Sequence, residues 1–170
     1  LGIEVLSPDV NMPGKFFTVK AKKIRFGLTA IKNVGETAVD SIIEARKKLG
    51  RDFKSVFEFA SLVDLRLVNK RAMEGLVMAG AFDSINSNRR AIFETIPDII
   101  SFGQNVRELN DDDSASLFGA EVLQETIIEP PLPKIDDWDD EERFRNELLV
   151  TGFYISNHPM EAYELEERAF

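Results

Sequence analysis

Hydrophobic and polar residues alternate only in the first part of the chain, and a helical period follows. Residues 1–27 contain the alternating stretch GIEVL, a turn-rich break, and FFTVKAKKIRFGL, which predicts a short β-hairpin turning at Ala21 and Lys22. From residue 36 onward, apolar residues recur every three to four positions. The pattern therefore predicts a mainly α fold with a short N-terminal β-hairpin.

Residues 28–109 are expected to form a bundle of short helices. The first full helix is predicted over residues 36–49, and two more begin at the N-caps Ser55 and Asn69. A longer helical pattern follows, in which Pro97 is expected to kink the helix or split it in two.

Residues 110–137 and 138–170 are predicted to differ in kind. The first segment contains NDDDS and EPPLPKIDD with little periodicity, which indicates a mobile acidic linker. The second begins with Trp138 before the acidic start of a helix, and we expect the ring to pack back on that helix as a hydrophobic staple.

Charge is distributed unevenly along the chain. Residues 1–90 hold 16 Lys and Arg against 10 Asp and Glu, a net charge of +6, whereas residues 91–170 hold 5 against 20, a net charge of −15. The first half can therefore approach nucleic acid, and the second half disfavours it. Apolar runs are too short to span a membrane, and the absence of cysteine favours a cytoplasmic location.

The stretch AIKNVGETAVDSII predicts a short helix, a tight turn and the start of a second helix. Backbone N–H groups at a helix start lack intrahelical partners and attract anions. A glycine lets a sugar-phosphate backbone approach closely, and such contacts read no base sequence. The candidate phosphate-binding residues are Lys32, Asn33, Val34, Gly35, Glu36 and Thr37.

A purely structural interpretation of this stretch stays open. Gly35 would then serve only to give a tight helix connection a positive φ, and the acidic stripe of Glu36, Asp40 and Glu44 would argue against DNA. A second unit of helix, short turn and helix nonetheless supports nucleic-acid binding, because it also places basic residues at a helix start. Its candidate residues are Asn69, Lys70 and Arg71.

No catalytic chemistry is expected in this chain. Its aspartates cluster in the predicted linker and at an exposed helix start, where solvated charge is the better interpretation than a metal site. We find no nucleophile–base pair and no cofactor motif, so no catalytic residue, metal ligand or cofactor is predicted. The apolar pair Leu117 and Phe118 in the acidic linker could enter a partner's pocket or cover the domain's own surface.

In order along the chain, GIEVLSPDVN, IRFGLTAIKNVGE, FKSVFEF, VNKRAMEGLVMAGAFDSI, NRRAIF, SLFG and GFYISNHPM resemble bacterial replicative DNA polymerase III alpha subunits. The resemblance covers nearly the whole chain. It implies a fragment with a tandem helix-hairpin-helix bundle and a clamp-binding region, lying before an OB-fold domain. The family's catalytic aspartates, and the Mg that they bind, belong to its palm, so this fragment is expected to be inert alone.

The resemblance also implies partners: double-stranded DNA, the sliding clamp and other subunits of the replicative holoenzyme. The family's hairpin usually reads Lys-Gly-Val-Gly, and Asn33 replaces its first glycine. Its clamp motif is typically Gln-x-x-Leu-Phe, which matches Leu117 and Phe118 with Ser114 in place of the glutamine. The implied function is sequence-independent duplex binding and clamp docking in processive DNA synthesis. The alternative is a helix-hairpin-helix domain used only for protein contacts.

Overall fold

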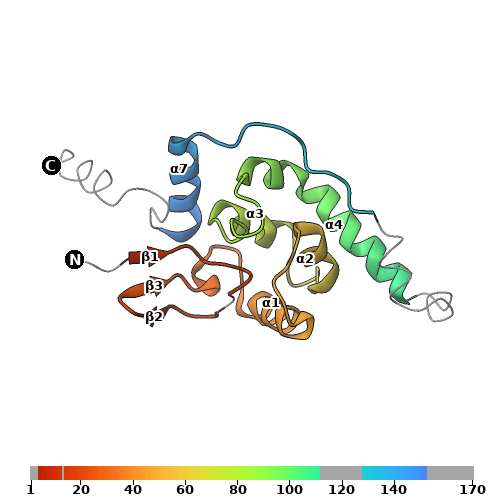
Figure 1. Ribbon diagram of the computed structural model, residues 1–170, viewed down its shortest axis with the longest axis horizontal. Coiled ribbons are helices and arrows are strands. Elements are labelled where there is room, and N and C mark those ends of the chain that lie inside the picture. Colours follow the sequence, from red (N-terminus) through yellow and green to blue (C-terminus); the bar gives the residue numbers. More distant parts are fainter. Residues whose placement is uncertain (1–3, 13, 112–127, 153–170) are drawn as a thin grey trace.

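A computed structural model describes residues 4–12, 14–111 and 128–152 (Figure 1). A small sheet forms at one end of the molecule from β1 (Glu4–Leu6), β2 (Thr18–Lys20) and β3 (Lys23–Arg25). The strand order is β1-β3-β2, with β1 parallel and β2 antiparallel to β3. Ala21 and Lys22 have positive φ angles of 51° and 63°, so the predicted β-hairpin and its turn are confirmed.

Helices make up most of the remaining described chain, which confirms the mainly α fold with its tandem helix-hairpin-helix bundle. The predicted N-caps are also confirmed, because Ser55 accepts from the Glu58 N–H and Asn69 from the Ala72 N–H. The elements are the 3₁₀ helix η1 (Leu28–Ala30) and helices α1 (Glu36–Leu49), α2 (Val56–Leu62), α3 (Lys70–Met78), α4 (Arg89–Asp111) and α7 (Asp140–Thr151).

Helix α4 forms the spine of the bundle and packs against both α2 and α3 (Figure 1). Phe57 on α2 and Phe102 on α4 meet edge to face at 5.3 Å between ring centroids. Of the two outcomes expected at Pro97, a kink or a split of the helix, the split is wrong because α4 runs through Pro97 as one element. Pro97 is exposed while its neighbours Ile96 and Ile99 are buried, so packing of the inner face holds the helix together.

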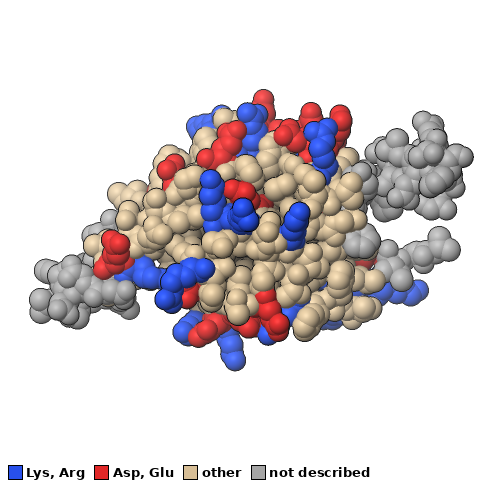
Figure 2. Space-filling model, turned by 180° about the vertical axis from the view of Figure 1, so that it is seen from behind, with Lys and Arg blue, Asp and Glu red and all other residues tan. Residues whose placement is uncertain are grey.

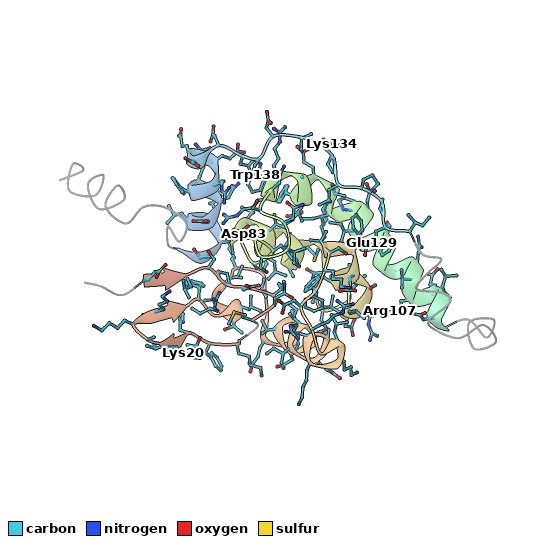
Figure 3. The ribbon with its side chains drawn as sticks, in the orientation of Figure 1. Lys20, Asp83, Arg107, Glu129, Lys134 and Trp138 are labelled. Carbon is cyan, nitrogen blue, oxygen red and sulfur yellow. The ribbon has the colours of Figure 1, made fainter. Side chains whose placement is uncertain are left out.

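The segment from residue 128 to α7 follows α4 in an extended conformation, with Glu129, Lys134 and Trp138 along it (Figure 3). The Asn88 side chain donates to the Ile135 carbonyl at 2.7 Å. This part of the predicted linker is therefore attached to the bundle, and α4 itself extends two residues beyond the predicted boundary at residue 109.

The ring of Trp138 packs edge to face on Phe93 of α4, with ring centroids 5.4 Å apart. Its packing on its own helix as a hydrophobic staple stays a prediction. The extended segment brings the tryptophan across α4. The C-terminal segment is thus packed on the bundle through the indole ring and through Val150, which is buried in the core. Among the described residues, no helix has the length and apolar character needed to cross a membrane.

Candidate functional site

The first hairpin turn obtains its shape from Asn33 and not from Gly35. Asn33 has a φ of 70°, the left-handed conformation that asparagine tolerates. Gly35 has φ −78° and ψ 168°, an extended conformation open to any residue. The interpretation in which Gly35 merely supplies a positive φ is therefore wrong.

The start of α1 is open to a ligand. Gly35 is its N-cap and no side chain caps the helix, so the N–H groups of Gly35, Glu36 and Thr37 have no acceptor among the described residues. All three residues are exposed. A Cβ placed on Gly35 would meet nothing within 4 Å, so the fold does not require a glycine here. The result is a concentration of free backbone donors at the positive end of a helix, which suits an anion.

Two distant elements fix this turn in place. Helix α3 crosses it so closely that a Cβ on Gly75 would lie 2.7 Å from the Lys32 carbonyl oxygen. On another side, the Lys32 N–H donates to the Val150 carbonyl in α7 at 2.7 Å. Neither contact could be predicted from local sequence, since they join residues about 40 and 120 positions apart.

Arg71 lies at the start of α3, on the helix face that crosses the turn of the first hairpin. It lies four residues before Gly75 and therefore on the same face of α3, which is the face that crosses the turn. Lys32 and Arg71 are exposed and have no acidic partner among the described residues, whereas Lys70 faces Glu74 at 4.0 Å. Lys32 thus lies in the first turn and Arg71 on the face of α3 that crosses it, and neither has an acidic partner among the described residues.

The acidic stripe on α1 is largely neutralised. Lys15, which no sequence motif marks, bonds Asp40 at 2.7 Å and Glu36 at 3.2 Å. Its pKa is raised above 10.5, first by the hydrogen bond to Asp40 and then by that to Glu36. Lys48 pairs with Glu44 at 3.0 Å. These pairs reduce the repulsion that the stripe would exert on a phosphate.

The second unit is not equivalent to the first. The side-chain oxygen of Asn69 already accepts the Ala72 N–H, so this helix start is capped from within. Its turn contains Asp64, whose pKa is lowered mainly by the hydrogen bonds from Arg66. Arg107 stands near the same carboxylate, at 3.9 Å. One N–H group of the second helix start is therefore capped and the carboxylate of its turn is paired, which leaves this site less available to an anion than the first.

Both turns nevertheless lie along the first half of α1. The Asp64 N–H donates to the Ser41 hydroxyl at 2.8 Å, and Ser41 lies five residues beyond Glu36, or about 7.5 Å along the helix. Figure 2 shows the face opposite to that of Figure 1, where Lys and Arg side chains lie in the middle and also, beside acidic side chains, along the upper and lower margins.

The aspartate clusters and the predicted clamp-binding residues are not part of this hairpin site. Asp137 accepts from the Arg90 N–H and from Arg143, and Asp139 caps α7, so these aspartates have structural partners. No group of three metal-binding side chains occurs in the part of the chain that the structure describes. The predicted clamp-binding residues lie outside the described residues, and they are Ser114, Leu117 and Phe118.

The chain has counterparts among known proteins. A model of the helix-hairpin-helix motif matches residues 2–92. The chain is 40% identical over 163 residues to DNA polymerase III subunit alpha of Thermus aquaticus, covering 96% of the chain and 13% of that relative. The corresponding subunit of Caulobacter vibrioides is 37% identical over 160 residues, covering 94% and 14%.

A third relative, from Borreliella burgdorferi, is 35% identical over 168 residues, with 96% of this chain and 14% of the relative covered. The chain thus spans only 13–14% of the length of these proteins. It belongs to the helix-hairpin-helix family and corresponds in sequence to one segment of DNA polymerase III subunit alpha.

Proposed function

We propose that the first hairpin binds the phosphate backbone of double-stranded DNA. The observation that carries this proposal is the uncapped start of α1, where exposed N–H groups adjoin a glycine that the fold does not require. A phosphate would accept from these N–H groups, and the missing Cβ lets the sugar-phosphate backbone come close. Because only phosphates are contacted, binding would be independent of base sequence.

Lys32 and Arg71 would supply the charge that makes this binding sensitive to salt. Each cation that neutralises a phosphate adds about one unit to the slope of log K against log salt concentration. We expect Lys32→Ala and Arg71→Ala each to weaken duplex binding and to lower that slope by about one unit. Lys70→Ala is the matched control on the same helix, and it should lower the slope less, since Glu74 faces that lysine.

Fluorescence anisotropy with a labelled duplex at several salt concentrations measures both quantities. Unchanged affinity and slope in Lys32→Ala and Arg71→Ala, with folding intact, would exclude phosphate binding at this hairpin. A wild-type chain that binds no duplex even at low salt would favour the alternative function, a domain used for protein contacts.

In the longer polymerase, this hairpin would hold the duplex during processive synthesis, in the cytoplasm and beside other replication subunits. We further propose that Leu117 and Phe118 dock on the sliding clamp. Burial of both side chains would contribute roughly 3–6 kcal/mol, against a cost of about 1–2 kcal/mol for each residue ordered. Clamp binding by this chain alone should therefore be weak, in the micromolar range or above.

Titration with the cognate clamp tests the docking proposal. Changing both Leu117→Ala and Phe118→Ala should abolish binding, whereas Ser114→Gln should tighten it by restoring a hydrogen-bonding side chain. Equal affinities for these variants and the wild type would remove the clamp from the proposal and leave the DNA hairpin untouched.

A further inference from the structure

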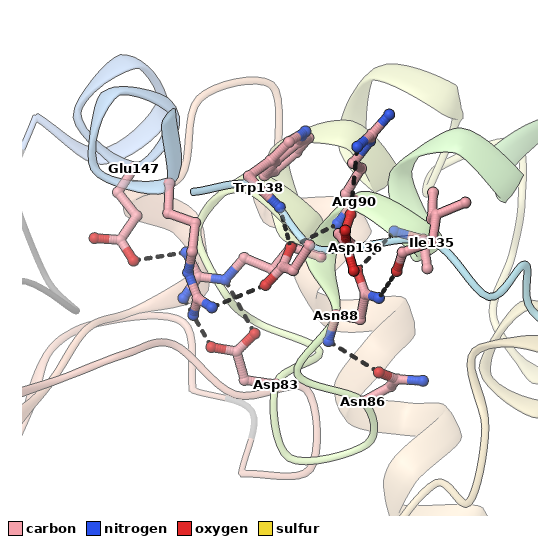
Figure 4. A network of polar contacts seen from close by, with 12 residues as sticks. Asp83, Asn86, Asn88, Arg90, Ile135, Asp136, Trp138 and Glu147 are labelled. Atoms are coloured by element: carbon pink, nitrogen blue, oxygen red, sulfur yellow. Dashed lines mark hydrogen bonds and ion pairs between the residues drawn. The ribbon is translucent and has the colours of Figure 1, made fainter. Parts of the chain in front are cut away.

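Helix α7 is attached to the bundle by an ion pair that water does not reach. Glu147 of α7 and Arg89 of α4 are 0% and 1% exposed, and Arg89 Nη1 donates to Glu147 Oε1 at 2.6 Å. Arg89 also makes a two-pronged contact to Asp83, through Nε at 3.0 Å and Nη2 at 2.7 Å. Figure 4 shows Asp83 and Glu147 on two sides of this guanidinium.

This pair is sensitive to the loss of one partner. Burial alone would lower the pKa of Arg89, but the hydrogen bonds that it donates to Asp83 and Glu147 more than offset this and raise the pKa. The guanidinium therefore stays charged, and removal of Glu147 would leave part of that buried charge uncompensated. Since α7 packs against α3, such a change would weaken the packing of α7 on the bundle.

The packing of α7 on the bundle affects the first hairpin through Val150. This residue lies three positions after Glu147 and so on the same helical face, and it is buried. Its carbonyl accepts the Lys32 N–H at 2.7 Å, which ties the exposed first turn to the end of α7. The chain from Arg89 through Glu147 and Val150 to Lys32 thus joins the bundle core to the candidate phosphate site.

We propose that Glu147 is a positioning residue for the first hairpin: by docking α7 it places the Val150 carbonyl that holds Lys32 and the turn. The functional part of this proposal rests on phosphate binding by the hairpin. It assigns α7, in the acidic half of the chain, to the scaffold of a DNA site in the basic half.

Amide hydrogen exchange of the chain without DNA tests the positioning directly. Glu147→Ala should speed exchange of the Lys32 amide about tenfold, and leave unchanged the Gly50 amide, which donates to the Arg46 carbonyl at the far end of α1. Glu141→Ala is the matched control, since Glu141 lies on the same helix with an 84% exposed side chain. This control should change neither amide.

Several results would overturn the positioning role. They are unchanged Lys32 exchange in folded Glu147→Ala, an equal increase at Lys32 and Gly50, or the same effect in Glu141→Ala. Should Glu147→Ala fail to fold, Val150→Ala provides the milder change, because it shortens the buried side chain beside the bonding carbonyl. This variant should speed exchange of the Lys32 amide and not of the Gly50 amide. An equal increase in exchange rate at both amides would again refute the positioning role.

Duplex affinity forms the second arm. Glu147→Ala should weaken it about tenfold, equivalent to 1.4 kcal/mol, and Glu141→Ala should not. Faster Lys32 exchange with unchanged affinity would contradict the functional link, provided that Lys32→Ala still weakens binding. If Lys32→Ala also binds like the wild type, the proposed function is what fails, and the exchange result continues to decide the positioning alone.

Discussion

Replacing Gly35 by serine is expected to stabilise the fold and to weaken duplex binding at the same time. Gly35 has the extended conformation typical of an N-cap, and a Cβ there meets nothing within 4 Å, so serine fits without strain. Its hydroxyl oxygen can accept one of the free N–H groups at the start of α1. The same oxygen would then occupy the donor that we assign to a phosphate.

The two effects differ in size. Serine exceeds glycine as an N-cap by only a few tenths of a kcal/mol, which raises the thermal midpoint by roughly 1 °C for a chain of this length. The loss in binding is larger, because a hydrogen bond to a charged group contributes about 1.5–3 kcal/mol. Duplex affinity should therefore fall roughly tenfold or more.

Denaturant unfolding and duplex titration on the same samples measure both effects. Gly35→Ala is the matched control: it adds the Cβ without an acceptor, so it should lower stability and cost less affinity than serine. A serine variant that is stabilised but binds duplex like the wild type would refute the assignment of the free N–H groups to a phosphate.

Three further predictions concern the elements around the hairpin. Gly75→Ala should lower the free energy of unfolding by roughly 1 kcal/mol in a denaturant titration, because overpacking against the Lys32 carbonyl costs about 1–3 kcal/mol and alanine's helix propensity returns about 1; equal or greater stability would contradict the close crossing. Hydrogen bonds from Arg51 hold the pKa of Glu58 below its ordinary value of 4.5, so their contribution is present above that pH and is lost as the pH falls through the lowered pKa. Glu58→Gln should flatten the acid side of a plot of unfolding midpoint against pH. An unchanged plot would mean that the pair of Arg51 and Glu58 does not contribute to the pH dependence of stability. Asn69→Ala should cost about 1 kcal/mol of unfolding free energy with little change in duplex affinity, whereas a large affinity loss would return Asn69 to the phosphate site.

Most of the fold could be predicted from helix caps and turns, which depend on residues close together in the sequence. Ser55 and Asn69 cap their helices as their side chains indicate, and the β-hairpin turns at Ala21 and Lys22. Asn33 takes the left-handed conformation in place of the family's glycine. Each of these features depends on a few neighbouring residues, which is why a sequence pattern can reveal it.

The rest depends on contacts between distant parts of the chain. Nothing around Lys15 indicates that it will neutralise carboxylates more than twenty positions away. Nothing around Trp138 indicates that its ring will pack on Phe93, because the extended segment that brings the ring across α4 begins far from Phe93 in the sequence. By contrast, the difference between the two hairpins is partly local, since the hydrogen-bonding partners of the Asn69 and Asp64 side chains lie within three residues of them.

Amide chemical-shift mapping with duplex DNA tests the central proposal most directly. Two duplexes of unrelated sequence should produce the largest shifts at the amides of Gly35, Glu36 and Thr37, with smaller shifts along the start of α3. These shifts should decline together as salt rises, because phosphate contacts release counterions. Shifts centred on residues 140–151, or shifts produced by only one of the two duplexes, would contradict phosphate binding at the first hairpin.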